Sequence, residues 1–124
     1  MNLDYNSGCF DEKVIAHEII HALGFHHEQT REDRDGFITV LEHNIKDCQD
    51  WCQNSCATNQ QSCQDCKTKC ERNPLTNNFK KYSQFTTFNL PYDAQSIMHY
   101  GSSFFSRNGR PTITSKVNQT QHLP

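Results

Sequence analysis

The six cysteines between Cys48 and Cys70 constrain the folding of this chain more than any other sequence feature. Residues 46–74 contain no Val, Ile, Leu, Met or Phe, so the packing of aliphatic side chains cannot order them. Seven cysteines in 124 residues also indicate an oxidising compartment, because thiols at this density otherwise need a metal or a strong reductant. We therefore expect a disulfide-held segment in a secreted or extracellular protein.

The spacing of these cysteines predicts how they pair. They form two triples with helical spacing, one at i, i+4 and i+8 and the other at i, i+3 and i+7: Cys48, Cys52 and Cys56, then Cys63, Cys66 and Cys70. Two short helices folding back through residues 57–62 would bring these faces together. Of the 15 connectivities that six cysteines allow, this predicts the nested set: Cys48–Cys70, Cys52–Cys66 and Cys56–Cys63.

The segment is most simply a stapled surface structure without activity of its own. Two alternatives remain open from the sequence. A second zinc cluster could use Cys63 and Cys66, although a secreted protein favours bridges over thiolate ligands. The segment could also gate access of a substrate.

Charge and length exclude several classes of protein. Lys and Arg total 12 against 14 Asp and Glu, a net charge of −2, and the basic residues are scattered, so we expect no nucleic-acid partner. No apolar stretch approaches the about 18 residues that cross a bilayer, so we expect no membrane span. The length is enough for one domain or part of one.

The first residues lack the features of a secretory leader. Met1–Asn6 has neither a basic region nor an apolar run, although the cysteines indicate secretion. We therefore expect an internal piece or a truncated version of a longer secreted protein. In that protein a cysteine upstream of Met1 would pair with Cys9.

A histidine pair lies on a predicted helix over Glu12–Leu23, where apolar residues recur at helical spacing. His17 and His21 are four residues apart and therefore share one helix face, which lets two imidazoles converge on one ion. Gly24 can adopt the positive φ that reverses the chain, so that His27 can return as a third nitrogen ligand. Three protein ligands leave the fourth position of a zinc ion open, which is typical of catalytic zinc.

Glu18 directly follows the first histidine, so its carboxylate is offset from the ligand face and can reach a metal-bound water.

Elsewhere the sequence predicts short elements: a strand over Phe37–Val40, a helical turn over Phe79–Tyr82 and a strand over Thr112–Thr114. Phe104 and Phe105 are expected in the core.

The chain resembles the astacin family of zinc metalloendopeptidases, within the metzincin clan. The likeness rests on His17–Asp35 (HEIIHALGFHHEQTREDRD) and on Ser96–Gly101 (SIMHYG), which is similar to the Met-turn of that family. Shorter pieces at Gly8–Cys9, Asn78–Phe79 and Gly109–Ile113 are also alike. The likeness covers most of the chain outside the cysteine segment.

The resemblance implies an α+β metzincin, or zincin-like, catalytic domain fragment. It would consist of an active-site helix, an irregular C-terminal subdomain with a Met-turn, and a disulfide-rich helical insert. Residues 1–124 would form a partial peptidase domain, with residues 46–74 as the cysteine-rich insert within it. The N-terminal subdomain of the family and its substrate-pairing strand would lie outside this sequence.

The resemblance also assigns roles to individual residues. Glu18 would act as general base and then acid, Met98 would lie beneath the metal, and Tyr100 would be a switchable additional zinc ligand that hydrogen-bonds the tetrahedral intermediate. One Zn²⁺ per catalytic site would be bound by three histidines: His17, His21 and His27.

Neighbouring polar residues are expected to be structural. Arg31, Asp33 and Arg34 would form an ion-pair network, His26 would lie at the surface, and His99 would be packed or hydrogen-bonded rather than catalytic. The implied function is zinc-dependent hydrolysis of peptide bonds in protein or peptide substrates. The alternative is a catalytically inactive, truncated extracellular module that retains the zinc site.

Overall fold

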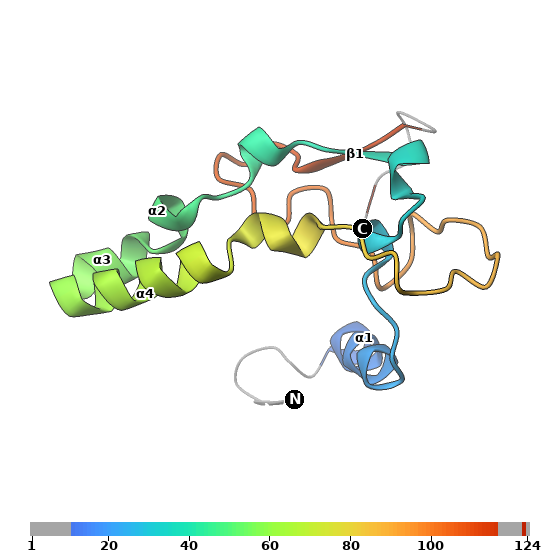
Figure 1. The fold of residues 1–124 in the computed structure, drawn as a ribbon, viewed down its shortest axis with the longest axis horizontal. Helices are drawn as coiled ribbons and strands as arrows, with labels where there is room; N and C mark the ends of the chain where they lie inside the picture. Colours follow the sequence, from blue (N-terminus) through green and yellow to red (C-terminus); the bar gives the residue numbers. More distant parts are fainter. Residues whose placement is uncertain (1–10, 117–122, 124) are drawn as a thin grey trace.

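The computed structural model describes residues 11–116 and 123, so Cys9 and its pairing lie outside the described residues. The chain combines helices with a small sheet, in agreement with the α+β prediction (Figure 1). Its regular elements are α1 (Glu12–Ala22), β1 (Ile38–Val40), α2 (Cys48–Trp51), α3 (Gln53–Thr58), α4 (Gln60–Arg72) and β2 (Ile113–Ser115). Short 3₁₀ turns join them: η2 (Glu28–Thr30), η3 (Arg34–Gly36), η4 (Glu42–Asn44) and η5 (Leu75–Phe79).

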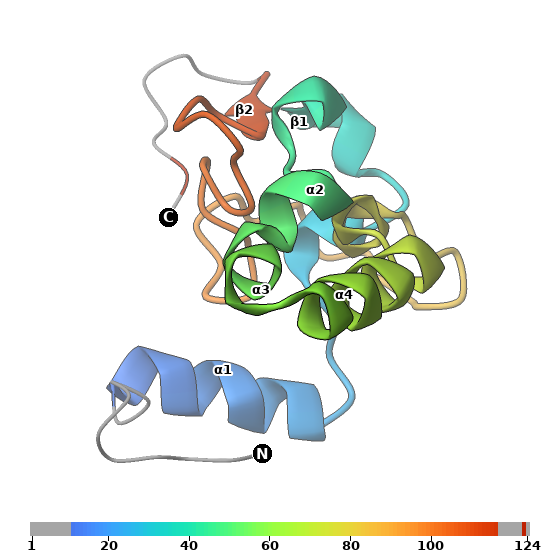
Figure 2. The ribbon, with the colours of Figure 1, turned by 90° about the vertical axis from the view of Figure 1, so that its left-hand side faces the viewer.

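Helix α1 lies to one side of the other elements (Figure 2). It begins where the Asp11 carboxylate accepts a hydrogen bond from the Lys13 N–H at 2.8 Å. It ends one residue before the predicted Leu23, and Gly24 has the expected positive φ of 93°. None of the helix residues is buried, and Ile19 is 50 % exposed. Within the described residues, α1 is therefore attached mainly through the turn that follows it.

The sheet joins segments that are far apart in the sequence. Strands β1 and β2 pair antiparallel, with Thr39 opposite Thr114. Strand β1 begins one residue later than predicted and ends where predicted, and β2 lies one residue further along the chain than predicted. The buried core beside the sheet consists of Ile38, Ile45, Phe79, Tyr100 and Ile113. No helix in the described part of the chain is long and apolar enough to cross a membrane.

Two local predictions were wrong. The helical turn expected over Phe79–Tyr82 lies earlier, at Leu75–Phe79, because the Phe79 carbonyl accepts a hydrogen bond from Arg34 at 2.7 Å and the chain then becomes extended. Phe104 is 52 % exposed rather than in the core, whereas Phe105 packs against the core. The backbone at Phe105 takes a φ of 58°, so only one of the two rings faces inward.

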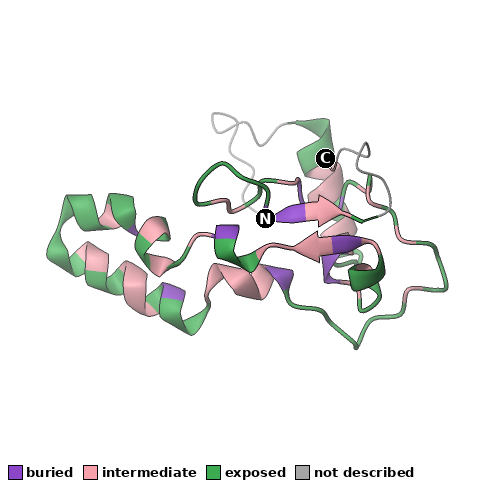
Figure 3. Cartoon of the chain, turned by 90° about the horizontal axis from the view of Figure 1, so that it is seen from above, coloured by how far each residue is buried: buried purple, intermediate pink, exposed green. Residues whose placement is uncertain are grey.

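The cysteine segment forms a helical hairpin that projects from the body (Figure 3). All three predicted bridges are present, Cys48–Cys70, Cys52–Cys66 and Cys56–Cys63. The structure has three helices rather than two, because the helical hydrogen bonding is interrupted at Cys52 between α2 and α3. Buried Cys52 and Cys70 occupy positions that aliphatic side chains fill in most small domains.

We expect the Cys52–Cys66 bridge to stabilise the hairpin more than the bridge at its tip. Replacing both cysteines by serine removes a bridge that closes a 14-residue separation, which corresponds to about 3 kcal/mol of local stability. Amide hydrogen exchange across residues 48–72 measures this loss. The matched control is the double serine replacement of Cys56 and Cys63, where Cys56 is exposed. Equal protection in both variants would contradict the prediction.

Candidate metal centre

Three histidines bring one ring nitrogen each to a common point. The Nε2 atom of His27 lies 3.1 Å from Nε2 of His21 and 3.2 Å from Nε2 of His17. All three rings are half-buried, and their ligand atoms lie within 4.8 Å of one another. His17 and His21 come from one face of α1, and His27 comes from the chain beyond Gly24, as the spacing predicted. Residues 11–116 and 123 contain no other such cluster of His, Cys, Asp or Glu.

Backbone carbonyls orient two of the three rings. His17 Nδ1 lies 2.8 Å from the Ile97 carbonyl oxygen, and His21 Nδ1 lies 2.9 Å from that of Phe25. A carbonyl can only accept, so each Nδ1 carries the proton and each Nε2 of a neutral ring presents a lone pair.

The cluster fits a tetrahedral metal ion. With His17 and His21 as neutral acceptors, a proton on His27 Nε2 could serve only one of its two close contacts. Zinc ligands at about 2.0–2.1 Å in tetrahedral geometry are separated from each other by roughly 3.3 Å, close to the observed 3.1 and 3.2 Å. A cation at the common point would resolve the repulsion between the lone pairs.

The electrostatics of His27 favour the metal-binding form. Burial, followed by the proximity of His21 and His17, lowers the pKa of His27 to about 4. The ring is therefore neutral over the physiological pH range, and protons do not compete for its lone pair.

A pocket of about 520 Å³ opens beside the histidines between α1 and the segment after residue 94. Glu18 and His17 line it from the helix, and Tyr100 and Phe104 line it from the opposite side. The Tyr100 ring centroid lies 4.5 Å from that of His27. Burial raises the pKa of Tyr100, with a smaller contribution from Tyr82, so the phenol keeps its proton at neutral pH. The pocket thus brings together Glu18, Tyr100 and His17, which also belongs to the histidine cluster.

The turn that carries Tyr100 is tied to the loop that carries His27. The Glu28 N–H donates to the Met98 carbonyl at 3.0 Å, and the Tyr100 N–H donates to Gln29 Oε1 at 3.1 Å. Gln29 is fully buried, and its Nε2 has no hydrogen-bond partner within the described residues. The two sides of the site are therefore held in fixed register.

His99 is hydrogen-bonded on both sides, as predicted. Its Nδ1 donates to the Tyr100 carbonyl, and its Nε2 accepts from the Tyr92 hydroxyl, each at 2.7 Å. Burial lowers the pKa of His99 and raises that of Tyr92, so both groups stay neutral. Sequence reasoning missed Tyr92 and Gln29, because no local spacing rule connects Gln29 with a partner 71 residues away.

Arg31 forms the centre of the predicted ion-pair network. Its guanidinium donates to both carboxylate oxygens of Asp33 at 2.9 and 2.8 Å and to Glu28 at 3.0 Å. It also donates to the carbonyls of Leu90 and Pro91. The hydrogen bonds with Asp33 raise the pKa of Arg31 and lower that of Asp33.

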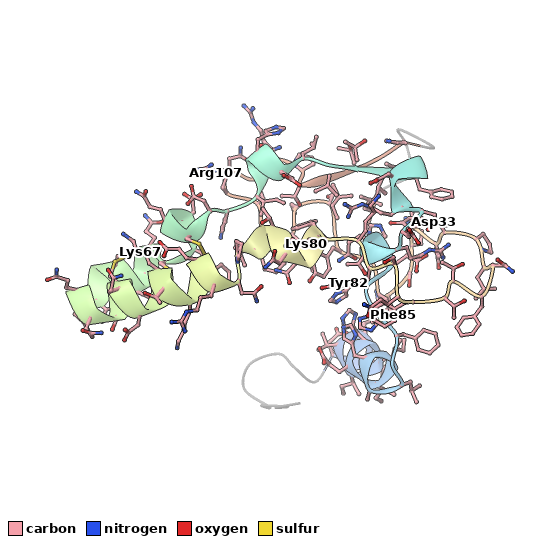
Figure 4. All side chains as sticks on the ribbon, in the orientation of Figure 1. Asp33, Lys67, Lys80, Tyr82, Phe85 and Arg107 are labelled. Atoms are coloured by element: carbon pink, nitrogen blue, oxygen red, sulfur yellow. A yellow bond between two sulfur atoms is a disulfide. The ribbon has the colours of Figure 1, made fainter. Side chains whose placement is uncertain are left out.

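Arg34 extends the network by donating to the Gln29 carbonyl at 2.8 Å and the Phe79 carbonyl at 2.7 Å. His26 lies outside the histidine cluster and stacks on Phe85 with ring centroids 3.8 Å apart. Figure 4 shows Phe85 and Tyr82 just above α1.

Cys63 and Cys66 are disulfide-bonded, so the alternative of a second zinc cluster through their thiolates was wrong.

Replacing Arg31 by lysine should destabilise the loop that presents His27. A single ammonium cannot reproduce the fork that bonds Asp33, Glu28 and two carbonyls, so we expect a loss of about 1 to 2 kcal/mol. Urea unfolding measures the change. Arg110→Lys, at an exposed position, is the matched control and should stay within about 0.5 kcal/mol of the parent. Similar losses in both variants would rule out this role of Arg31.

The chain matches the protein-family model of the astacin peptidases. The model, described as Astacin, aligns with residues 2–71 and 58–123. These two ranges include all three histidines of the cluster and the turn that carries Tyr100.

Curated proteins similar to the chain include three named proteases. The chain is 38 % identical over 113 residues to zinc metalloproteinase nas-14 of Caenorhabditis elegans, covering 90 % of this chain and 17 % of that protein. It is 40 % identical to blastula protease 10 of Paracentrotus lividus, covering 92 % of this chain and 15 % of that protein. It is 35 % identical to meprin A subunit alpha of Rattus norvegicus, covering 94 % and 12 %. The chain therefore spans less than a fifth of each of these relatives.

A solved structure has the same fold. It is high choriolytic enzyme 1, a hatching enzyme zinc-protease from Oryzias latipes, with a TM-score of 0.71 and 32 % sequence identity. The match covers 98 % of this chain and 48 % of that chain.

Proposed function

The chain belongs to the astacin family of metallopeptidases, and from this premise we propose that the protein carrying it is a zinc-dependent endopeptidase. The observation that supports this most directly is the convergence of three histidine Nε2 atoms beside a pocket lined by Glu18 and Tyr100. His17, His21 and His27 would hold one Zn²⁺ and leave its fourth position open. Residues 1–124 would be part of the peptidase domain, and residues 46–74 an insert within it.

Zinc in this site would lower the pKa of a bound water to about 7 and polarise the scissile carbonyl. Glu18 follows the ligand His17 on α1 and lines the pocket without belonging to the histidine cluster. Its carboxylate would take the proton of the attacking water and pass it to the departing amine nitrogen.

Tyr100 would act from the opposite wall of the pocket. Its phenol keeps its proton because burial raises its pKa, so it can donate a hydrogen bond to the oxyanion that develops on the substrate carbonyl. In the absence of substrate we propose the same oxygen as an additional, displaceable zinc ligand. The hydrogen bonds of the 98–100 turn to Glu28 and Gln29 would keep the phenol at the correct distance.

The substrates would be proteins or peptides outside the cell. Three disulfides within one hairpin agree with a secreted protein.

One observation favours the alternative, a zinc-binding module without activity: no residue of α1 is buried within the described part of the chain. Within these residues the helix that carries Glu18 has little packing to fix it, apart from the hydrogen bond of His17 to the Ile97 carbonyl. A change at Glu18 separates the two functions: an endopeptidase would lose its peptide-cleaving activity, whereas an inactive module has no such activity to lose.

Glu18→Gln in the zinc-loaded protein should abolish turnover and preserve metal binding. The amide keeps the shape of the side chain but cannot accept a proton, so we expect a loss of about 10²- to 10⁴-fold in kcat. Cleavage of a fluorogenic peptide and zinc content per chain are the two measurements. Glu42→Gln, at an exposed position on η4, is the control. If the rate falls only a few-fold, the base is another group; if the parent protein cleaves nothing, the inactive module is correct.

Tyr100→Phe should reduce kcat by about 10²-fold with little change in KM, because the lost hydrogen bond forms only in the transition state. The ring itself packs against His27 and Phe79, and phenylalanine retains this packing. Zinc content should stay the same, since three histidines hold the ion. An unchanged kcat would show that the phenol takes no part in catalysis.

A further inference from the structure

The cysteine-rich hairpin is fixed to the segment that borders the proposed active site. The Arg107 guanidinium pairs with Asp50 at 3.1 Å and Asp47 at 3.3 Å, at the start of α2 (Figure 4). The Lys46 N–H donates to the Phe105 carbonyl at 2.8 Å. These bonds, together with the capping box of Asp47 and Asp50, hold the beginning of the hairpin beside residues 105–107.

Aromatic rings connect the hairpin with the pocket of Glu18 and Tyr100. Phe104 lines that pocket and is half-exposed. The next ring, Phe105, lies 5.7 Å from Tyr100 and 6.3 Å from Trp51, measured between centroids. Trp51 is therefore no more than about 12 Å from Tyr100. These ring contacts place the hairpin close to the proposed catalytic residues.

A second hollow, of about 500 Å³, opens on the hairpin at Trp51. Trp51 is 50 % exposed, which is unusual for so large an aromatic side chain. The Cys66 and Cys70 residues and Leu75 contribute apolar lining, and polar residues complete the lining: Ser55, Ser62, Asp65, Lys69 and Asn73.

This composition suits a polypeptide. An aromatic surface binds an apolar side chain, while donors and acceptors around it can pair with the amide groups of a peptide backbone. Asp65 and Lys69 offset each other in charge, so the groove favours neither an anion nor a cation.

We propose that this groove extends the substrate-binding surface and takes an apolar or aromatic side chain of the polypeptide being cleaved. The proposal rests on the proposed endopeptidase function. An extended chain advances about 3.3 to 3.6 Å per residue, so the side chain that reaches Trp51 lies no more than about four residues from the residue beside Tyr100. The hairpin is then a specificity-determining surface rather than only a stapled projection.

The first test compares peptides of two lengths on the zinc-loaded protein. A short fluorogenic peptide extends two residues on each side of the scissile bond. Two long peptides extend six residues each way and carry phenylalanine four residues from the bond, one on each side. Trp51→Ala should raise KM at least ten-fold for one long peptide and leave kcat/KM of the short peptide within two-fold.

Two further variants separate loss of the groove from loss of folding. Ser55→Arg fills the groove from α3 without altering Trp51 or its contact with Phe105, and should reproduce the effect. Lys67→Ala changes α4 outside the groove lining and should have none. If Trp51→Ala and Ser55→Arg both leave KM for the long peptides unchanged, the groove does not bind substrate.

A second test does not depend on catalysis. Trp51 is the single tryptophan of the chain, so its fluorescence reports on the groove directly, with Trp51→Phe as the background. In the Glu18→Gln variant the responding long peptide should change this signal and the short peptide should not. A signal change with protein concentration alone would point to a second copy of the chain and overturn the proposal. Binding without cleavage by the parent would refute the endopeptidase function and leave the groove as a peptide site.

Discussion

The candidate site is built around three imidazole nitrogens that converge on one point, with Nε2 separations of 3.1 and 3.2 Å from His27. Carbonyls of Ile97 and Phe25 hold the rings of His17 and His21 with their Nε2 lone pairs facing inward, and His27 closes the cluster. The glycine turn after α1 and the hydrogen-bonded turn at residues 96–100 both contribute to this arrangement. A cation at the centre would stabilise this geometry.

Outside the sheet and the core beside it, side-chain hydrogen bonds to the backbone replace regular secondary structure. Arg31 and Arg34 donate to four carbonyls from three different segments, and Gln29 and His99 fix the backbone of Tyr100. A planar guanidinium suits this task, because its five donors point in fixed directions and it stays charged. The irregular half of the chain therefore has a defined shape despite its small aliphatic core.

The hairpin uses a different solution to the same shortage of apolar residues. Its three bridges run between α4 and the pair α2–α3, and they substitute for a core. The ion pairs of Arg107 with Asp47 and Asp50 then attach this rigid unit next to Phe105. The surface of the hairpin is thereby placed near a site whose histidines follow the pattern of the astacin family.

The sequence by itself determined what depends on local periodicity. Helical spacing indicated α1, the shared face of His17 and His21, and the nested pairing of six cysteines, because a helix places residues four apart on one side whatever surrounds it. The roles of Glu18 and Tyr100 in catalysis stay predictions. Only the tertiary structure decided the partners of Gln29 and Tyr92, the exposure of Phe104 and the position of Trp51 beside Phe105. These contacts join segments that no repeat in the sequence relates, so they follow from how the folded elements pack and not from the spacing of residues along the chain.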